Sequence, residues 1–124
     1  MLIKNMKKKQ LGDWGEKTAA DFLVEQGVEI IGRNVRTQNG EIDIIGKKDG
    51  LLIFFEVKTR RSTKFGNPED AVNSIKRDHM IRSAIEYIQS NLDLNTEWRM
   101  DVIAIQVDRL NNTNIRWFKN AISD

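Results

Sequence analysis

The fold of this chain is decided by residues 41–60, which read EIDIIGKKDGLLIFFEVKTR. Two runs rich in β-branched and large apolar residues flank the dipeptide Asp49-Gly50. This dipeptide is among the strongest signals for a tight turn between antiparallel strands. Residues 41–47 and 51–60 are therefore predicted to form a β-hairpin.

The length of the hairpin loop decides which charged side chains meet. A two-residue loop places Asp43 directly opposite Glu56. It also places Glu41 opposite Lys58 on the same face. A three-residue loop would instead oppose Asp43 to Phe55 and separate the two carboxylates. We expect the two-residue loop, which brings the Cβ atoms of the first pair to about 5 Å.

Glu56 and Lys58 are charged residues on a strand whose earlier residues are apolar on both faces. Such a strand is predicted to be central and buried, so charges at its end need a reason. Two carboxylates with water and phosphate oxygens form the coordination that Mg²⁺ or Mn²⁺ requires. Lys58 would orient an attacking water or stabilise charge on the phosphorus centre. A partly buried ion network without catalysis is the alternative interpretation.

Composition narrows the choice of chemistry. The chain has 124 residues, a net charge of +2, no cysteine and one histidine, His79. Thiolate zinc sites, iron–sulfur clusters, cysteine nucleophiles and sites that need two histidines are therefore excluded within one chain. We expect a basic N-terminal extension over residues 1–11 and a single domain over residues 12–124. The apolar runs are too short to span a membrane, so we expect a cytoplasmic protein without a membrane partner.

The remaining elements complete an α/β fold. Residues 13–26 carry apolar side chains at three- and four-residue spacings and are predicted to be helical. Further elements are expected as a strand over 29–36, a short helix to about residue 73, a longer helix over 75–91, and strands over 98–107 and 115–118. The order α-β-β-β-α-β predicts a mixed central sheet flanked by helices, with strands 51–60 and 98–107 parallel.

The charged strand ends also carry a specific motif. Gly40-Glu41-Ile42-Asp43 followed by Phe55-Glu56-Val57-Lys58 resembles the signature of the PD-(D/E)xK nuclease superfamily. A longer ordered set resembles the YraN family of bacterial endonuclease-like proteins, which are related to archaeal Holliday junction resolvases. That set adds Gly15-Glu16, Arg33-Asn34, Phe65-Gly66, Ala71-Val72, Lys76 and Arg99-Met100-Asp101-Val102.

The resemblance implies a restriction-endonuclease-like core and a function. It implies Asp43 and Glu56 as ligands of Mg²⁺ or Mn²⁺, and Lys58 as the catalytic lysine. Glu16 would be an additional acidic group near the metal, although its spacing from Asp13 also fits a helix capping box. The expected function is a metal-dependent endonuclease that hydrolyses DNA phosphodiester bonds, on branched junction or flap DNA. A non-catalytic DNA-binding module and a protein-interaction subunit stay open as alternatives.

Basic residues are candidates for contacts with DNA phosphates. We predict this role for Arg60, Arg61, Lys64, Lys76 and Arg77. Nothing in the sequence indicates readout of base edges, so DNA would be recognised through its backbone and shape. A resolvase-like role favours a homodimer, because two strands are cut symmetrically.

Asp101, His79 and the three tryptophans are expected to be structural. Asp101 would pair with Arg99 or Arg60, although it could instead lie near the site. His79 would lie on the helix surface, since a lone histidine has no partner for catalysis. Trp14, Trp98 and Trp117 would pack in the core rather than stack on bases.

Overall fold

The computed structural model describes residues 3–61, 74–91 and 97–122. These residues form one mixed sheet and its helices, in the order α-β-β-β-α-β-β after a short 3-10 turn, as expected for the α/β fold. The elements are η1 (Ile3–Asn5), α1 (Lys8–Glu25), β1 (Glu29–Thr37), β2 (Gly40–Lys48), β3 (Leu51–Arg61), α2 (Ser74–Ser90), β4 (Trp98–Val107) and β5 (Thr113–Ile122).

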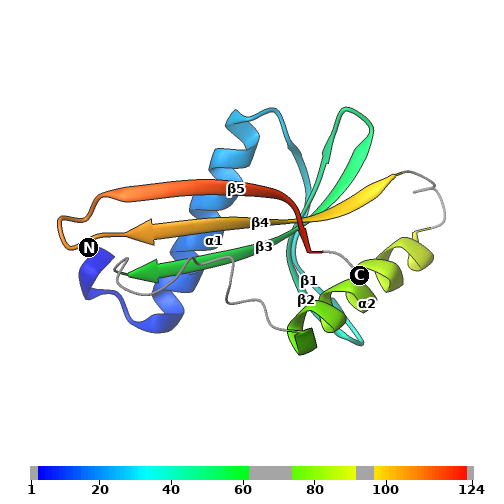
Figure 1. Ribbon diagram of the computed structural model, residues 1–124, viewed down its shortest axis with the longest axis horizontal. Helices are drawn as coiled ribbons and strands as arrows, with labels where there is room; N and C mark the ends of the chain where they lie inside the picture. Colours follow the sequence, from blue (N-terminus) through cyan, green and yellow to red (C-terminus); the bar gives the residue numbers. More distant parts are fainter. Residues whose placement is uncertain (1–2, 62–73, 92–96, 123–124) are drawn as a thin grey trace.

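The sheet has five strands in sequence order, and only β3 and β4 are parallel. This confirms the predicted parallel pair. The β2–β3 ladder starts at Lys48↔Leu51 and its last pair is Ile44↔Phe55. Beyond that pair β2 continues along β1, and β3 continues along β4. The sheet therefore forks, and Figure 1 shows β1 and β2 turning away from β3, β4 and β5.

The hairpin loop has the expected two residues. Asp49 and Gly50 have φ of 51° and 79°, as the favoured hairpin turn requires at both central positions. Lys48 pairs with Leu51, so the register is the one predicted from the sequence.

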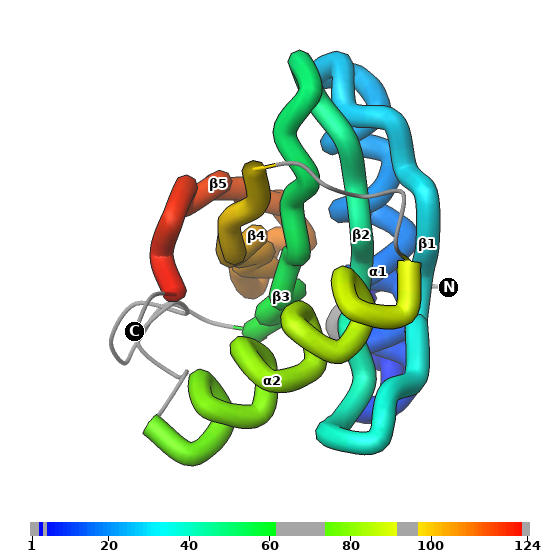
Figure 2. Tube along the Cα trace, turned by 90° about the vertical axis from the view of Figure 1, so that its right-hand side faces the viewer, coloured from blue at the N-terminus to red at the C-terminus, as the bar shows by residue number. Residues whose placement is uncertain are grey.

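Apolar side chains pack in two layers, one on each face of the sheet. Ala19, Ala20 and Leu23 of α1 pack on the first face against residues that include Ile53 and Phe55. On the second face, Ala84 of α2 packs in a cluster that includes Leu52 and Phe54. Figure 2 shows the two helices on opposite sides of β2. The alternation of β3 side chains between these layers is the strand periodicity expected from its sequence.

Helix α1 begins at Lys8, so the predicted start at Asp13 was wrong. The backbone N–H of Lys7 donates to the Gln10 side chain (3.0 Å), which caps the helix six residues before Asp13. Leu11 is buried, and the burial of its side chain stabilises the additional turn of the helix. Asp13 and Glu16 lie inside α1, so their predicted capping box does not form.

Gly15 brings α1 close to the end of β3. A Cβ atom at this position would lie 1.8 Å from Thr59 Oγ1, so only glycine fits the contact. Because Glu16 follows Gly15, the same close approach carries Glu16 towards the fork of the sheet.

Two further predictions differ from the structure. Strand β5 runs from Thr113 to Ile122 and is longer than the predicted 115–118, because Ile122 is buried in the second layer. Ile81, Ile85 and Ile88 recur at three- and four-residue spacings, which predicts that all three are buried, but Ile85 is 40% exposed. The predicted short helix ending near residue 73 lies outside the described residues, as does Lys64. Among the described helices, none is long and apolar enough to cross a membrane.

Candidate functional site

Asp43 and Glu56 meet where the sheet forks. The last pair of the β2–β3 ladder is Ile44↔Phe55. Asp43 lies one residue before Ile44 on β2, and Glu56 lies one residue after Phe55 on β3. In place of a carbonyl of β2, the Asp43 carboxylate accepts the Val57 N–H (2.9 Å). The Asp43 side chain also makes a hydrogen bond with Glu56. The two carboxyl groups therefore share one point, as the hairpin register predicted.

The pairing has the electrostatic consequence expected of two adjacent acids. Burial raises the pKa of Asp43 to about 8, and the charge of Glu56 adds to the increase. The N–H of Val57 works in the opposite direction but is outweighed. Asp43 thus holds a proton near neutral pH unless a cation replaces it.

Two lysines contact the same oxygen of Glu56. Lys58 Nζ lies 3.2 Å from Glu56 Oε1, and Lys76 Nζ of α2 also contacts that atom. The Glu56 side chain is 6% exposed, so this ion pair lies in a largely dry environment. Lys58 was expected here. Lys76 is predicted to contact DNA phosphates, and its contact with Glu56 was not predicted.

The two lysines differ in how firmly they hold their protons. Burial lowers the pKa of Lys58, and its contact with Lys76 lowers it further, against the opposing effect of Glu56. Burial is the largest single effect on Lys76 and acts to lower its pKa, but the contacts with Glu56 and Lys58 and the charges of Glu56 and Asp43 together outweigh it, so the pKa is raised. Lys76 is therefore the firmer counter-charge to Glu56, and Lys58 is the more readily deprotonated amine.

Glu16 and Glu41 join Asp43 on the open side of the fork. One carboxylate oxygen from each of the three residues lies within 4.8 Å of the others. Burial raises the pKa of Glu16, followed by the charge of Glu41. Three acids from α1 and β2 at this spacing can bind a divalent cation through oxygen atoms.

Glu41 is the acid that sequence reasoning missed as a possible ligand. We predicted that it would face Lys58, but the β2–β3 ladder ends before that pair is reached. Glu41 instead pairs with Arg36 of β1 (Nε–Oε2, 3.7 Å). Its position two residues before Asp43 on one strand was the available signal.

Comparison with known proteins places the chain in a family. The model of the uncharacterised protein family UPF0102 matches residues 15–105. The chain belongs to this family. The match confirms the resemblance to the YraN family predicted from the motifs.

Relatives of similar length support the assignment. A UPF0102 protein of Caldicellulosiruptor saccharolyticus is 41% identical over 94% of this chain and 99% of the relative. A UPF0102 protein of Caldicellulosiruptor bescii is 44% identical over the same shares. A UPF0102 protein of Clostridioides difficile is 44% identical over 81% of this chain and 88% of the relative.

Three of the basic residues predicted for phosphate contacts have exposed side chains in this UPF0102 chain, and Lys64 lies outside the described residues. Arg60 and Arg61 are exposed at the end of β3, two and three residues beyond Lys58. Arg61 Nη2 also donates to the Ile3 carbonyl (3.4 Å). Arg77 is exposed on α2, next to Lys76. The three side chains are exposed to solvent, and their contact with DNA phosphates stays a prediction.

The residues expected to be structural are placed as predicted. Asp101 is fully buried and accepts hydrogen bonds from Arg99 Nε, Trp117 Nε1 and the Asn120 N–H at 2.7 to 3.1 Å. His79 is exposed on α2. The three tryptophans pack against the two apolar layers.

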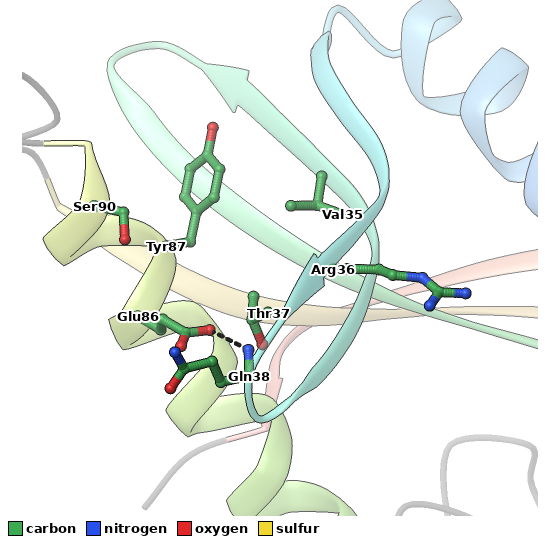
Figure 3. A pocket seen from close by; sticks show the side chains of 7 residues that line it. All are labelled: Val35, Arg36, Thr37, Gln38, Glu86, Tyr87 and Ser90. Carbon is green, nitrogen blue, oxygen red and sulfur yellow. Dashed lines mark hydrogen bonds between the residues drawn. The ribbon is translucent and has the colours of Figure 1, made fainter.

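A groove of about 430 Å³ lies between the end of β1 and α2 of this UPF0102 chain, beside the fork. Figure 3 shows Glu86 and Tyr87 on its α2 side, with Glu86 accepting the Gln38 N–H (2.8 Å). Arg36 is the cation among its lining residues, and its side chain points away from Tyr87. The groove therefore presents an acid and a phenol, and its charge does not suit a phosphate.

Proposed function

We propose that this protein is a metal-dependent endonuclease that hydrolyses phosphodiester bonds in DNA, with branched junctions or flaps as substrates. The observation that carries the proposal is the contact between Asp43 and Glu56 at the fork, with Lys58 on Glu56. Two acids and a lysine that leave the core at one point are the groups that metal-assisted phosphate hydrolysis uses.

The residues present fit a divalent metal ion. Asp43 and Glu56 would hold Mg²⁺ or Mn²⁺, and Glu16 and Glu41 offer further oxygen atoms on the open side. The raised pKa of Asp43 supports this assignment, because a cation would relieve the repulsion that makes Asp43 keep a proton. When bound, the ion polarises the phosphate and lowers the pKa of a bound water.

The two lysines that contact Glu56 have different proposed roles. Lys76 neutralises Glu56 from α2, so Lys58 is not needed as its only counter-charge. Lys58 is then available to orient the attacking water or to stabilise charge on the reacting phosphate. Burial and the neighbouring Lys76 lower the pKa of Lys58, so this amine gives up a proton more readily than an exposed lysine does.

DNA would be held through its phosphates. Arg60, Arg61 and Arg77 have exposed side chains, and Lys64 and Lys76 keep their predicted role as further contacts. Such contacts carry little sequence information, so binding would depend on backbone and shape. A homodimer would give symmetric cleavage of two strands.

The proposal is tested by cleavage of a panel of branched, single-stranded and duplex DNAs with Mn²⁺. Wild type is compared with Glu56→Ala and Lys58→Ala, and the exposed Glu25→Gln on α1 serves as the control. We expect each of the two site variants to lose about 100-fold or more in rate, as loss of a charge-stabilising group does. Equal cleavage by all four proteins would indicate a contaminating nuclease and remove the proposal.

One observation favours the alternative of a DNA-binding module without catalysis. Glu56 already has two lysine partners, so its burial is satisfied without a metal. A binding module would bind DNA with a steep salt dependence, to the same extent with Mn²⁺ and with a chelator. Metal-dependent cleavage that is lost in Lys58→Ala excludes this alternative.

A further inference from the structure

Asn34 occupies an unusual backbone position next to the candidate site. Its φ is 50°, in the left-handed region that asparagine tolerates better than most residues. The pairs on either side of it, Arg33↔Ile44 and Val35↔Ile42, keep one register. Asn34 of β1 therefore lies across from Asp43 of β2.

The side chain of Asn34 reaches two acids from different elements. Two facing carboxylates require the amide nitrogen, rather than the oxygen, to point towards them. In this orientation the nitrogen donates to Glu16 Oε1 (2.6 Å) and to Glu41 Oε1 (3.1 Å). Glu16 belongs to α1 and Glu41 to β2, so one amide links the helix to the strand.

This link opposes a repulsion. The oxygens of Glu16, Glu41 and Asp43 lie within 4.8 Å of one another, and like charges at this distance repel. Arg36 contacts only Glu41 within this group, and its own side chain is 89% exposed. Among the described contacts, the Asn34 amide is the group that bonds to both glutamates.

We propose that Asn34 is a positioning residue: its amide holds the Glu16 and Glu41 carboxylates together so that both face the point that Asp43 faces. The proposal rests on the metal-dependent function above and assigns a role to the Arg33-Asn34 motif, which that function left unused. Asn34 acts through the two glutamates by fixing the direction of their oxygens, as outer partners of metal ligands do.

The test measures Mn²⁺ binding to the full chain by the electron paramagnetic resonance signal of free Mn²⁺. Asn34→Gly removes the amide but keeps the left-handed backbone, because glycine adopts positive φ without strain. Asn111→Gly is the matched control, since Asn111 has φ of 66° in the turn between β4 and β5, away from the fork. Asn34→Ser, whose side chain is too short to bridge both acids, is the second variant.

We expect Asn34→Gly and Asn34→Ser to bind Mn²⁺ about tenfold more weakly than wild type, and Asn111→Gly to bind it equally well. The melting temperature without metal should change no more in Asn34→Gly than in Asn111→Gly.

The inference is overturned if both Asn34 variants bind Mn²⁺ within about twofold of wild type. It is also overturned if both bind weakly only because they lose the circular dichroism of the folded chain, since Asn34 would then be structural. If wild type itself binds no Mn²⁺, the proposed metal-dependent function fails, and the inference fails with it. Failure of the metal-dependent function appears as absence of Mn²⁺ binding in wild type. Failure of the Asn34 role alone appears as Mn²⁺ binding in wild type that the Asn34 variants keep.

Discussion

Two aspartates of the same sheet, the fully buried Asp101 and the partly buried Asp43, have opposite surroundings. Asp101 on β4 is fully buried among donors, which are Arg99, the Trp117 indole and the Asn120 N–H. Asp43 on β2 has one backbone donor and faces acids. A buried carboxylate that is surrounded by donors stabilises the fold. One that faces other carboxylates costs stability, and it is retained here at the point where we place the chemistry.

The largest expected effect is a dependence of the free energy of unfolding on pH that comes from Asp43. Because the pKa of Asp43 is raised from 3.8 to about 8, the folded chain binds a proton there more tightly than the unfolded chain does. This contribution is fully present below about pH 4 and is lost as pH rises to about 8. The free energy of unfolding without metal should therefore fall by a few kcal/mol over this range.

Urea denaturation with a chelator at pH 5 and pH 8 measures this loss. In Asp43→Asn the loss should be much smaller, because the titrating group is gone. A wild-type slope in that variant would show that Asp43 is not the group responsible.

Asp101→Asn should destabilise the chain by about 3 kcal/mol at both pH values, since it leaves Arg99 without its buried partner. Urea denaturation is again the measurement. Asp108→Asn on the exposed turn after β4 is the control and should cost much less. An Asp101→Asn variant as stable as wild type would remove the contrast between the two aspartates.

Replacing each of the two lysines that contact Glu56 tests their different roles in the proposed cleavage. Lys58→Met should lower the rate of Mn²⁺-dependent DNA cleavage about 100-fold, because it removes the amine that we propose to stabilise charge on the reacting phosphate. Lys76→Met should lower it only about tenfold, since Lys58 still pairs with Glu56. Single-turnover rates measure both. A greater loss in Lys76→Met would exchange the two roles.

The smallest effect is expected at Gly15, which sets the distance of α1 from β3. Gly15→Ala should destabilise the chain by about 1 to 2 kcal/mol, because its Cβ would collide with Thr59. It should also weaken Mn²⁺ binding by moving Glu16. Thermal denaturation and Mn²⁺ titration measure the two changes.

Gly12→Ala on the same helix is the matched control. A Cβ atom there meets nothing within 4 Å, so this variant should gain about 0.5 to 1 kcal/mol in stability and bind Mn²⁺ as wild type does. Equal behaviour of the two alanine variants would mean that the contact with Thr59 does not position Glu16.

Local patterns predicted the part of the site that lies on the hairpin. The Asp49-Gly50 turn fixed the loop length, and the two-residue period of strands then fixed Asp43 against Glu56. The same counting failed for Glu41, because it assumes that paired strands stay paired. β2 and β3 separate beyond Ile44 and Phe55, so the assumption does not hold for Glu41.

The rest of the site comes from parts of the chain far apart in sequence. Lys76 reaches Glu56 because α2 packs on one face of the sheet. Glu16 reaches Asp43 because α1 packs on the other face, closely enough at Gly15. Neither distance is encoded in a local spacing, since each depends on how a helix settles on the sheet.

The ordered motifs were enough to predict the family. Turn chemistry and strand periodicity act over a few residues, so they were enough to predict the hairpin register and the meeting of Asp43 with Glu56. Three features came from the packing of the whole chain: the sheet forks at this point, Lys76 joins Lys58 on Glu56, and Asn34 links Glu16 to Glu41. Those contacts depend on the packing of two helices and an edge strand around one opening, and such packing is settled by the whole chain.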